Sequence, residues 1–120
     1  MLANLVIAAL ALWGWTLPIR IDASYDARYA TNPLYATAFS IHNDYSDCSI
    51  RVYDRFYTLS PHEQSNVIVH EVGHCLGLQH ILAPGVMRAD AIHDLTEVDR
   101  VEFRRVHPLG HRIGLVVAHD

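Results

Sequence analysis

The chain has 120 residues, of which 51% are hydrophobic and 18% are charged, and its formal net charge is −4. This length and composition fit one globular domain and leave no room for a second one. Because neither a basic patch nor an acidic run accounts for the net charge, the sequence does not indicate binding to nucleic acid or to an anionic membrane surface.

The opening segment, residues 1–15, is apolar apart from Asn4. It resembles a secretory signal because small residues flank Leu10 in the manner of a cleavage site, but no basic residue precedes the apolar run. It is shorter than the ~20 residues that a membrane-spanning helix needs, so no stable membrane span is expected. Two interpretations stay open: a leader whose removal accompanies secretion or another extracytoplasmic location, or a structural segment preceding a single domain of residues 16–120.

Three strands are predicted in the first half of the chain. Ile19 and Ile21 alternate with charged residues, which predicts a strand at residues 17–23. The stretches LYATAFSI and CSIRVYDRFY predict two more strands, at residues 34–41 and 48–57, on either side of a polar turn. These two strands are close enough in sequence to form a hairpin.

Several helix-start signals coincide just after the third predicted strand. Ser60 can cap a helix, Pro61 suits its first position and Glu63 completes a capping box. The helix body is EQSNVIVHEVGHCLGL, and Gly77 is placed to end it in a left-handed cap. Gly73 lies inside and weakens the helix by about 1 kcal/mol relative to alanine, so something other than helix propensity must keep this segment helical.

A second helix is predicted from Glu97 to about Val106. Thr96 is its cap and Asp99 the partner of the cap, and a proline and a glycine follow the helix. The remaining residues, 111–120, fit either a short terminal strand or disorder.

The stretch HEVGHCLGLQH has the residue types and spacing of a metal site. His70 and His74 are four residues apart, so both imidazoles project from one face of the helix. Zinc is the natural candidate among divalent ions, since imidazole suits it and a catalytic site uses three protein ligands and keeps one position open. A turn at Gly77 makes His80 reachable as the third ligand. Glu71 is the candidate general base, because zinc lowers the pKa of bound water toward ~7.

This stretch resembles the metzincin zinc-peptidase signature, whose positions are filled by His70, Glu71, His74, Gly77 and His80. Metzincins also carry a methionine-containing turn under the metal, and the resemblance implies that Met87 is that residue and does not bind zinc. The neighbouring residues, together with LTEVD before the last helix, are most similar to the matrixin (matrix metalloprotease-like) branch. Ala89 is not the tyrosine that astacins and serralysins use near zinc.

The resemblance implies an α+β fold, in which a small twisted mixed sheet packs on the active-site helix and a C-terminal helix follows. It implies a zinc-dependent endopeptidase with one catalytic Zn²⁺ ion and a peptide or protein substrate. The substrate would pair with an exposed edge strand at 34–41, with side-chain preference set near residues 81–86. The long first helix of matrixins is missing, so one sheet face needs another cover, which the opening segment or an oligomer can supply; the oligomeric state is open.

Two other functions stay open: a zinc-stabilised, non-catalytic peptide-binding module, and a zinc hydrolase of a non-peptide amide. Glu71 argues against the first, since a structural site gains nothing from a base. Cys75 points away from the metal, and Cys48 and Cys75 either form a disulfide or remain free thiols. Solvated roles are expected for the other histidines considered, which are His62, His93, His107, His111 and His119.

Overall fold

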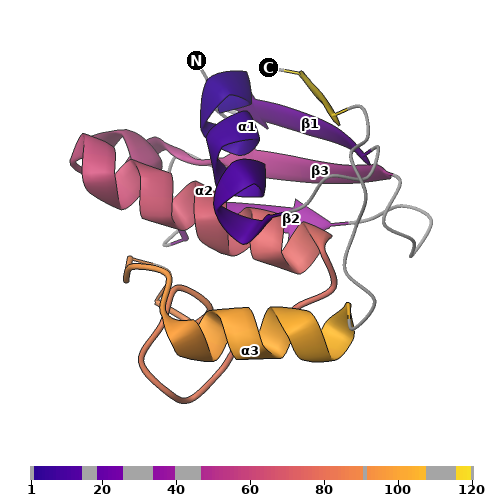
Figure 1. The fold of residues 1–120 in the computed structure, drawn as a ribbon. Coiled ribbons are helices and arrows are strands. Elements are labelled where there is room, and N and C mark those ends of the chain that lie inside the picture. The colour runs from indigo at the N-terminus through magenta and orange to yellow at the C-terminus, as the bar shows by residue number, and fades with distance from the viewer. Residues whose placement is uncertain are drawn as a thin grey trace.

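The computed structural model describes residues 2–14, 19–25, 34–39, 47–90, 92–107 and 116–119. The predicted α+β class is confirmed, and Figure 1 shows the helices gathered on one side of a small sheet. In chain order the elements are α1 (Leu2–Trp13), β1 (Ile19–Tyr25), β2 (Ala36–Phe39), β3 (Asp47–Val52), the 3-10 helix η2 (Asp54–Thr58), α2 (Pro61–Cys75), α3 (Glu97–Val106) and β4 (Val116–His119).

The sheet has four strands in the order β2-β3-β1-β4 and is mixed, as expected. β2 and β3 pair in the antiparallel sense, which confirms the predicted hairpin, and β1 is parallel to both of its neighbours. β2 therefore lies at one edge of the sheet, as the sequence predicted. Within the segment for which two interpretations were open, residues 116–119 form β4 at the opposite edge.

The predicted third strand is wrong beyond Val52. The chain there turns into η2, with Phe56 N–H donating to the Tyr53 carbonyl oxygen at 2.9 Å. Tyr53 and Phe56 are both buried. Their spacing of three residues matches the 3-10 period, whereas a continued strand would send them to opposite faces.

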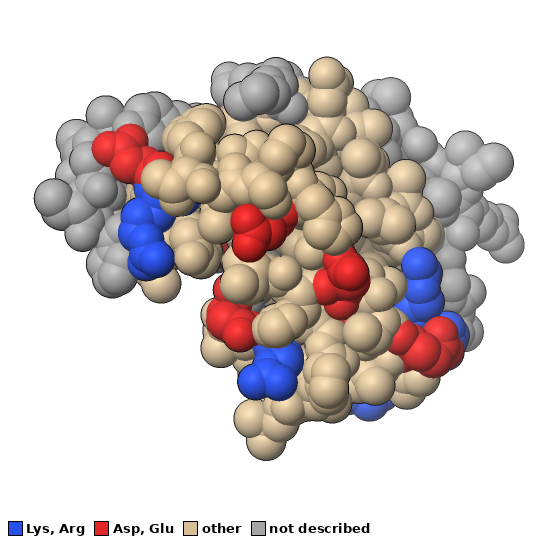
Figure 2. Space-filling model, turned by 90° about the vertical axis from the view of Figure 1, so that its left-hand side faces the viewer, with Lys and Arg blue, Asp and Glu red and all other residues tan. Residues whose placement is uncertain are grey.

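Two helices cover one face of the sheet. α1 contacts β1, β4 and α2, and α2 contacts β2 and β3, so the helices share the face between them. Within the described residues, no helix combines the length and the apolarity needed to cross a membrane. On the face that Figure 2 presents, acidic and basic side chains are scattered, and neither sign of charge gathers in one patch.

The core lies between this sheet face and the two helices. Its largest fully buried aliphatic side chains include Val6, Leu10, Ile21, Ile50, Val52, Val67, Ile68 and Val72. A disulfide between Cys48 and Cys75 ties β3 to the last residue of α2, and both cysteines are buried. The pairing of the two cysteines, which the sequence left open, is thereby settled.

Both predicted capping boxes are present. Glu63 N–H donates to Ser60 Oγ at 3.2 Å and Ser60 N–H donates to Glu63 Oε1 at 3.1 Å, at the start of α2. Thr96 N–H donates to the Asp99 carboxylate at 2.8 Å, and α3 has the bounds that the sequence predicted. Local side-chain chemistry therefore starts both helices.

Candidate metal centre

Three histidines converge where α2 ends. His70 and His74 belong to the helix, and His80 belongs to the segment that follows it. The possible ligand atoms of the three side chains all lie within 4.8 Å of one another. Their ring centroids are separated by 4.7, 4.9 and 5.1 Å. The three side chains form a group that could hold a metal ion, as the sequence predicted.

The chain reverses direction at Gly77, and this reversal brings His80 back to the helix. Gly77 has a φ of 90°, in the left-handed region. Its N–H donates to the His74 carbonyl oxygen at 2.9 Å, and Leu78 N–H donates to the Gly73 carbonyl oxygen at 3.0 Å. These two bonds make a Schellman motif, so the predicted left-handed end of the helix is confirmed.

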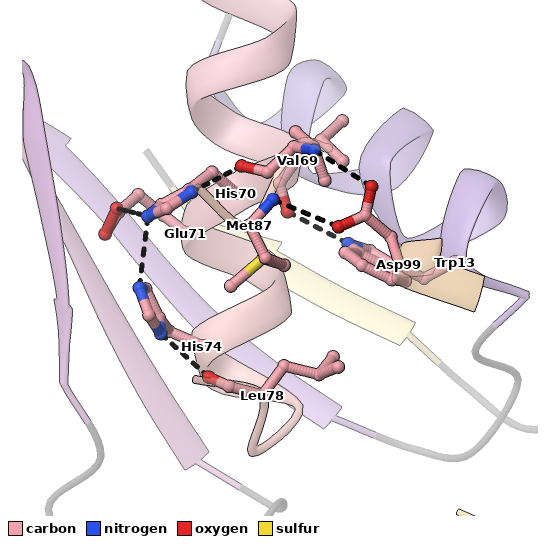
Figure 3. A network of polar contacts seen from close by, with 9 residues as sticks. Trp13, Val69, His70, Glu71, His74, Leu78, Met87 and Asp99 are labelled. Atoms are coloured by element: carbon pink, nitrogen blue, oxygen red, sulfur yellow. Dashed lines mark hydrogen bonds and ion pairs between the residues drawn. The ribbon is translucent and has the colours of Figure 1, made fainter. Parts of the chain in front are cut away.

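Backbone carbonyls orient the two helical imidazoles, as Figure 3 shows. His70 Nδ1 lies 2.6 Å from the Val86 carbonyl oxygen, and His74 Nδ1 lies 2.8 Å from the Leu78 carbonyl oxygen. Because a carbonyl oxygen only accepts, each Nδ1 carries the hydrogen and donates it. Each Nε2 is then left with a lone pair, which is the state that a metal ligand needs.

The two Nε2 atoms face each other at 3.1 Å. Neither carries a hydrogen in this tautomer, so the contact is a pair of opposed lone pairs, which a metal cation near both atoms, or a proton on one of them, relieves. Nitrogen ligands about 2.0–2.1 Å from a tetrahedral zinc ion lie roughly 3.3 Å apart, close to the observed spacing. The donor set therefore fits a metal ion of this kind.

Burial keeps the helical imidazoles neutral. It lowers the pKa of His70 from 6.5 to about 4, and the carbonyl of Val86 opposes that shift only in part. Burial also lowers the pKa of His74, with Leu78 opposing the shift in the same way. Protons therefore compete weakly with a metal ion for these two Nε2 atoms at neutral pH.

Glu71 lies beside the histidine group. Its side chain is buried, and its Oε2 atom is 4.0 Å from His70 Nε2. Burial raises the pKa of the Glu71 carboxyl to about 8, while a hydrogen bond from the Ala38 backbone acts against the rise. A cation held by the histidines would lower this pKa, so the carboxyl is suited to exchanging a proton near neutral pH.

A cavity of about 550 Å³ opens onto the histidine group. It lies between β2 and α2, where the exposed sheet edge meets the helix. Its opposite wall comes from the segment after Met87, and residues 81–86, which were expected to shape the side-chain pocket, do not line it. The described lining residues are Leu34, Tyr35, Ala36, Thr37, Ala38, Arg55, Val67, His70, Glu71, His74, His80, Ala89, Asp90 and Ile92.

The glycine between the two helical histidines makes room for a methionine. Met87 is fully buried, and a Cβ added to Gly73 would overlap its sulfur atom. The same Cβ would lie 3.0 Å from Cζ2 of Trp13. Thioether and indole therefore pack directly against the helix backbone behind the histidines, which supplies the tertiary support that Gly73 requires.

Trp13 links α1 to the helix that carries the histidines. Its indole N–H donates to the Val69 carbonyl oxygen at 2.9 Å, and this bond is buried (Figure 3). The indole stacks on Phe103 of α3, with ring centroids 5.8 Å apart. Sequence reasoning missed Trp13, because its partners lie far along the chain and no local pattern marks it.

Asp99 anchors the turn that contains Met87. Its fully buried carboxylate accepts the N–H of Val86 at 2.9 Å and that of Met87 at 3.1 Å, in addition to its capping bond with Thr96. The carbonyl of Val86 in turn accepts from His70. The sequence identified Asp99 only as a capping partner, and its second role needed the fold to become visible.

Of the other five histidines considered, two follow the prediction of a solvated side chain. His62 and His93 are exposed, and they lie 2.6 Å from Asp94 and 2.9 Å from Asp90, respectively. His111 lies outside the described residues, and so does the side chain of His119.

The expectation of a solvated His107 is wrong. Its ring is buried, and its Nε2 atom lies 2.6 Å from the carbonyl oxygen of Leu76 at the end of α2. Helix ends leave carbonyl oxygens without intrahelical partners, and an imidazole from α3 satisfies this one. The partner lies 31 residues away in sequence, so no local pattern indicated it.

These observations place four side chains, His70, His74, His80 and Glu71, around one end of a cavity at a sheet edge. The identity of a bound metal does not follow from the donor set alone, since several divalent ions accept imidazole ligands. Comparison of the chain with protein-family models, with curated proteins and with solved structures finds no match.

Proposed function

We propose that the chain is a zinc-dependent endopeptidase of the metzincin type, similar to the matrixin branch. The observation that carries the proposal is the pair of opposed Nε2 atoms, His70 and His74, 3.1 Å apart with the Glu71 carboxyl beside them. Three imidazoles satisfy a catalytic zinc ion while leaving one coordination position for water, and a purely structural site would have no use for the carboxyl.

Zinc at this site would lower the pKa of a bound water toward ~7 and polarise a carbonyl oxygen. His70 and His74 would hold the ion through Nε2, and their Nδ1–H bonds to backbone carbonyls keep the rings in that orientation. The Glu71 carboxylate accepts the proton of the attacking water and donates it to the leaving amine. Its burial beside His70 keeps this proton from exchanging freely with bulk solvent.

The substrate is an extended peptide that lies along β2. β2 is an edge strand, so one side of its backbone has no strand partner among the residues that the structure describes, and it lines the cavity together with α2. A peptide added to this edge gains main-chain hydrogen bonds, while the cavity receives a side chain. The disulfide is compatible with an extracellular protein, and we include secretion in the proposal because disulfides persist in oxidising compartments.

The test compares the wild type with Glu71→Gln in metal content and in cleavage of a mixed peptide library. We expect one equivalent of zinc in both proteins, with a loss of cleavage of at least ~100-fold in the variant. Glutamine keeps the size of the side chain, so retained zinc separates loss of the base from loss of the site.

Zinc in both proteins with peptide binding but no cleavage by the wild type would overturn the enzyme proposal in favour of a peptide-binding module. Hydrolysis of small amides without peptide cleavage would assign a different substrate class. Absence of any bound metal after dialysis against micromolar zinc would refute the proposed role of the histidines.

A further inference from the structure

The cavity that the histidines line also has a cationic side chain. Arg55, in η2, lines it near Leu34 and Tyr35, and it is the one lysine or arginine among the described lining residues. Its guanidinium carbon lies 4.7 Å from the centroid of the Tyr35 ring, and its Nη2 donates to the Tyr35 hydroxyl at 3.3 Å. These contacts lay the guanidinium against the Tyr35 ring, and the planar fork of its N–H groups suits bidentate binding of a carboxylate.

The separation between Arg55 and the part of the cavity next to Glu71 follows from the geometry of β2. The backbone of Ala38 hydrogen-bonds with Glu71, so Ala38 marks the reacting end, and Tyr35, which holds Arg55, is three positions earlier in the chain. A strand rises ~3.3 Å per residue, so the two ends are about 10 Å apart. An extended peptide beside β2 has the same rise, and its residue about three positions from the scissile bond comes level with Tyr35.

An acidic group at the opposite end of the cavity gives a charged substrate a preferred direction. Asp90 lines the cavity and acts electrostatically on His70, so it lies toward the histidines, where it pairs with His93 at 2.9 Å. A carboxylate on the peptide is therefore attracted toward Arg55 and repelled from the end near Asp90. Antiparallel pairs are about two to three times as common as parallel ones, and a peptide that pairs with β2 in this sense runs toward Tyr35 in its C-terminal direction.

Resting on the proposed peptidase function, we propose that Arg55 determines specificity by binding a carboxylate of the substrate, about three residues to the C-terminal side of the scissile bond. The carboxylate is either an Asp or Glu side chain or the C-terminus of a short peptide. Both present the same pair of oxygen atoms to the guanidinium, and charge-assisted bonds of this kind are about twice as strong as neutral ones.

The test uses matched peptides that carry Glu or Gln at each of the four positions after the cleaved bond. A second set ends three residues after that bond, with either a free C-terminal carboxylate or an amide. We expect kcat/KM to favour Glu over Gln about tenfold at one position, or the free acid over the amide by a similar factor. The two peptide sets distinguish the two sources of the carboxylate.

Variants identify the residue responsible. Arg55→Gln should abolish the acid preference, so that kcat/KM for the Glu peptide is about equal to that for the Gln peptide. Arg55→Lys should keep part of the preference, because lysine retains the charge but lacks the planar guanidinium with its paired donors. Arg51→Gln is the matched control: Arg51 also lies over an aromatic ring, that of Phe39 at 5.1 Å, but it does not line the cavity. The control should keep the full preference.

The outcomes separate this inference from the function on which it rests. Cleavage without an acid preference, or with a preference that survives in Arg55→Gln, overturns the inference and leaves the peptidase standing. If the wild type cleaves none of the peptides, the proposed function fails. In that case the role of Arg55 is tested by measuring the binding of the same peptides to the Glu71→Gln variant. Equal dissociation constants for the Glu and Gln peptides would overturn the inference.

Discussion

Replacing Gly73 by alanine tests the packing behind the histidines. In an isolated helix this change would stabilise by about 1 kcal/mol, because alanine has the higher helix propensity. Here the new Cβ would overlap the Met87 sulfur and approach Trp13 Cζ2 to 3.0 Å. Met87 is fully buried and has no solvent to move into, while Trp13 is held by its hydrogen bond to Val69. The methionine side chain must therefore be displaced within a packed core.

Overpacking of this kind costs about 1–3 kcal/mol, and the severity of the overlap places Gly73→Ala near the upper value. When the gain of about 1 kcal/mol in helix propensity is subtracted from this cost, we expect a net loss of about 2 kcal/mol in the free energy of unfolding. The sign should reverse in a Met87→Ala background. There the overlap with sulfur is gone, and the remaining 3.0 Å contact with Trp13 needs only a small shift of the indole toward the space that the thioether leaves, so Gly73→Ala should become stabilising by up to the propensity term, about 1 kcal/mol. The coupling energy between the two sites is then about 3 kcal/mol.

Urea unfolding of the wild type, both single variants and the double variant measures this coupling, with equal m-values as the condition for comparing free energies. Met87→Ala alone should lose about 2–5 kcal/mol, so the cycle is best run with metal present to keep all four proteins folded. An additive cycle, or a Gly73→Ala protein more stable than the wild type, would refute the account of why a glycine stands at this position.

Three further changes have defined outcomes. Replacing both Cys48 and Cys75 by alanine should lower the free energy of unfolding by about 3.5 kcal/mol, from the chain-entropy estimate for a disulfide across a sequence separation of 27; equal midpoints in denaturant would contradict this. Asp99→Asn should weaken binding of the proposed zinc ion about 10–100-fold, because the turn that positions His70 loses part of its anchor. Competition with a chelator would measure this change, and an unchanged affinity would show that Asp99 does not support the site. Trp13→Phe removes the N–H together with the five-membered ring of the indole, so a loss of at least about 1 kcal/mol, from the hydrogen bond and from packing, is expected in thermal or urea unfolding.

The parts of this protein that were predictable carry their signals locally. α2 and α3 begin where capping residues stand, because a capping box is complete within four residues. The histidine group was likewise readable, since a four-residue spacing and one glycine determine where the three rings go. The position of β2 at a sheet edge, by contrast, was expected only from the family resemblance and from no local signal, and the sheet order agrees with it.

The parts that escaped prediction depend on distant partners. Trp13 was not identified, and His107 was wrongly expected to be solvated. Each forms a hydrogen bond with a carbonyl oxygen of α2 or of its end, and each does so from a distant part of the chain. Arg55 was read as part of a strand, and only the turn into η2 brings it to the cavity. Sequence patterns report which face of an element is apolar, but they do not report which other element will cover it.

The pairing of β4 with β1 has a consequence for how the protein is made. Ile19 lies opposite Val116, so the sheet joins segments from the two ends of the chain. During synthesis β1 must wait with one open edge until residues 116–119 have left the ribosome, and open strand edges invite pairing with other chains. Asp99, which anchors the Met87 turn, also emerges well after the helix that carries His70. The nascent chain therefore supports its histidine site only after α3 has emerged and closes its sheet only after β4 has emerged, and until then a chaperone that shields the open edge of β1 would be of most use.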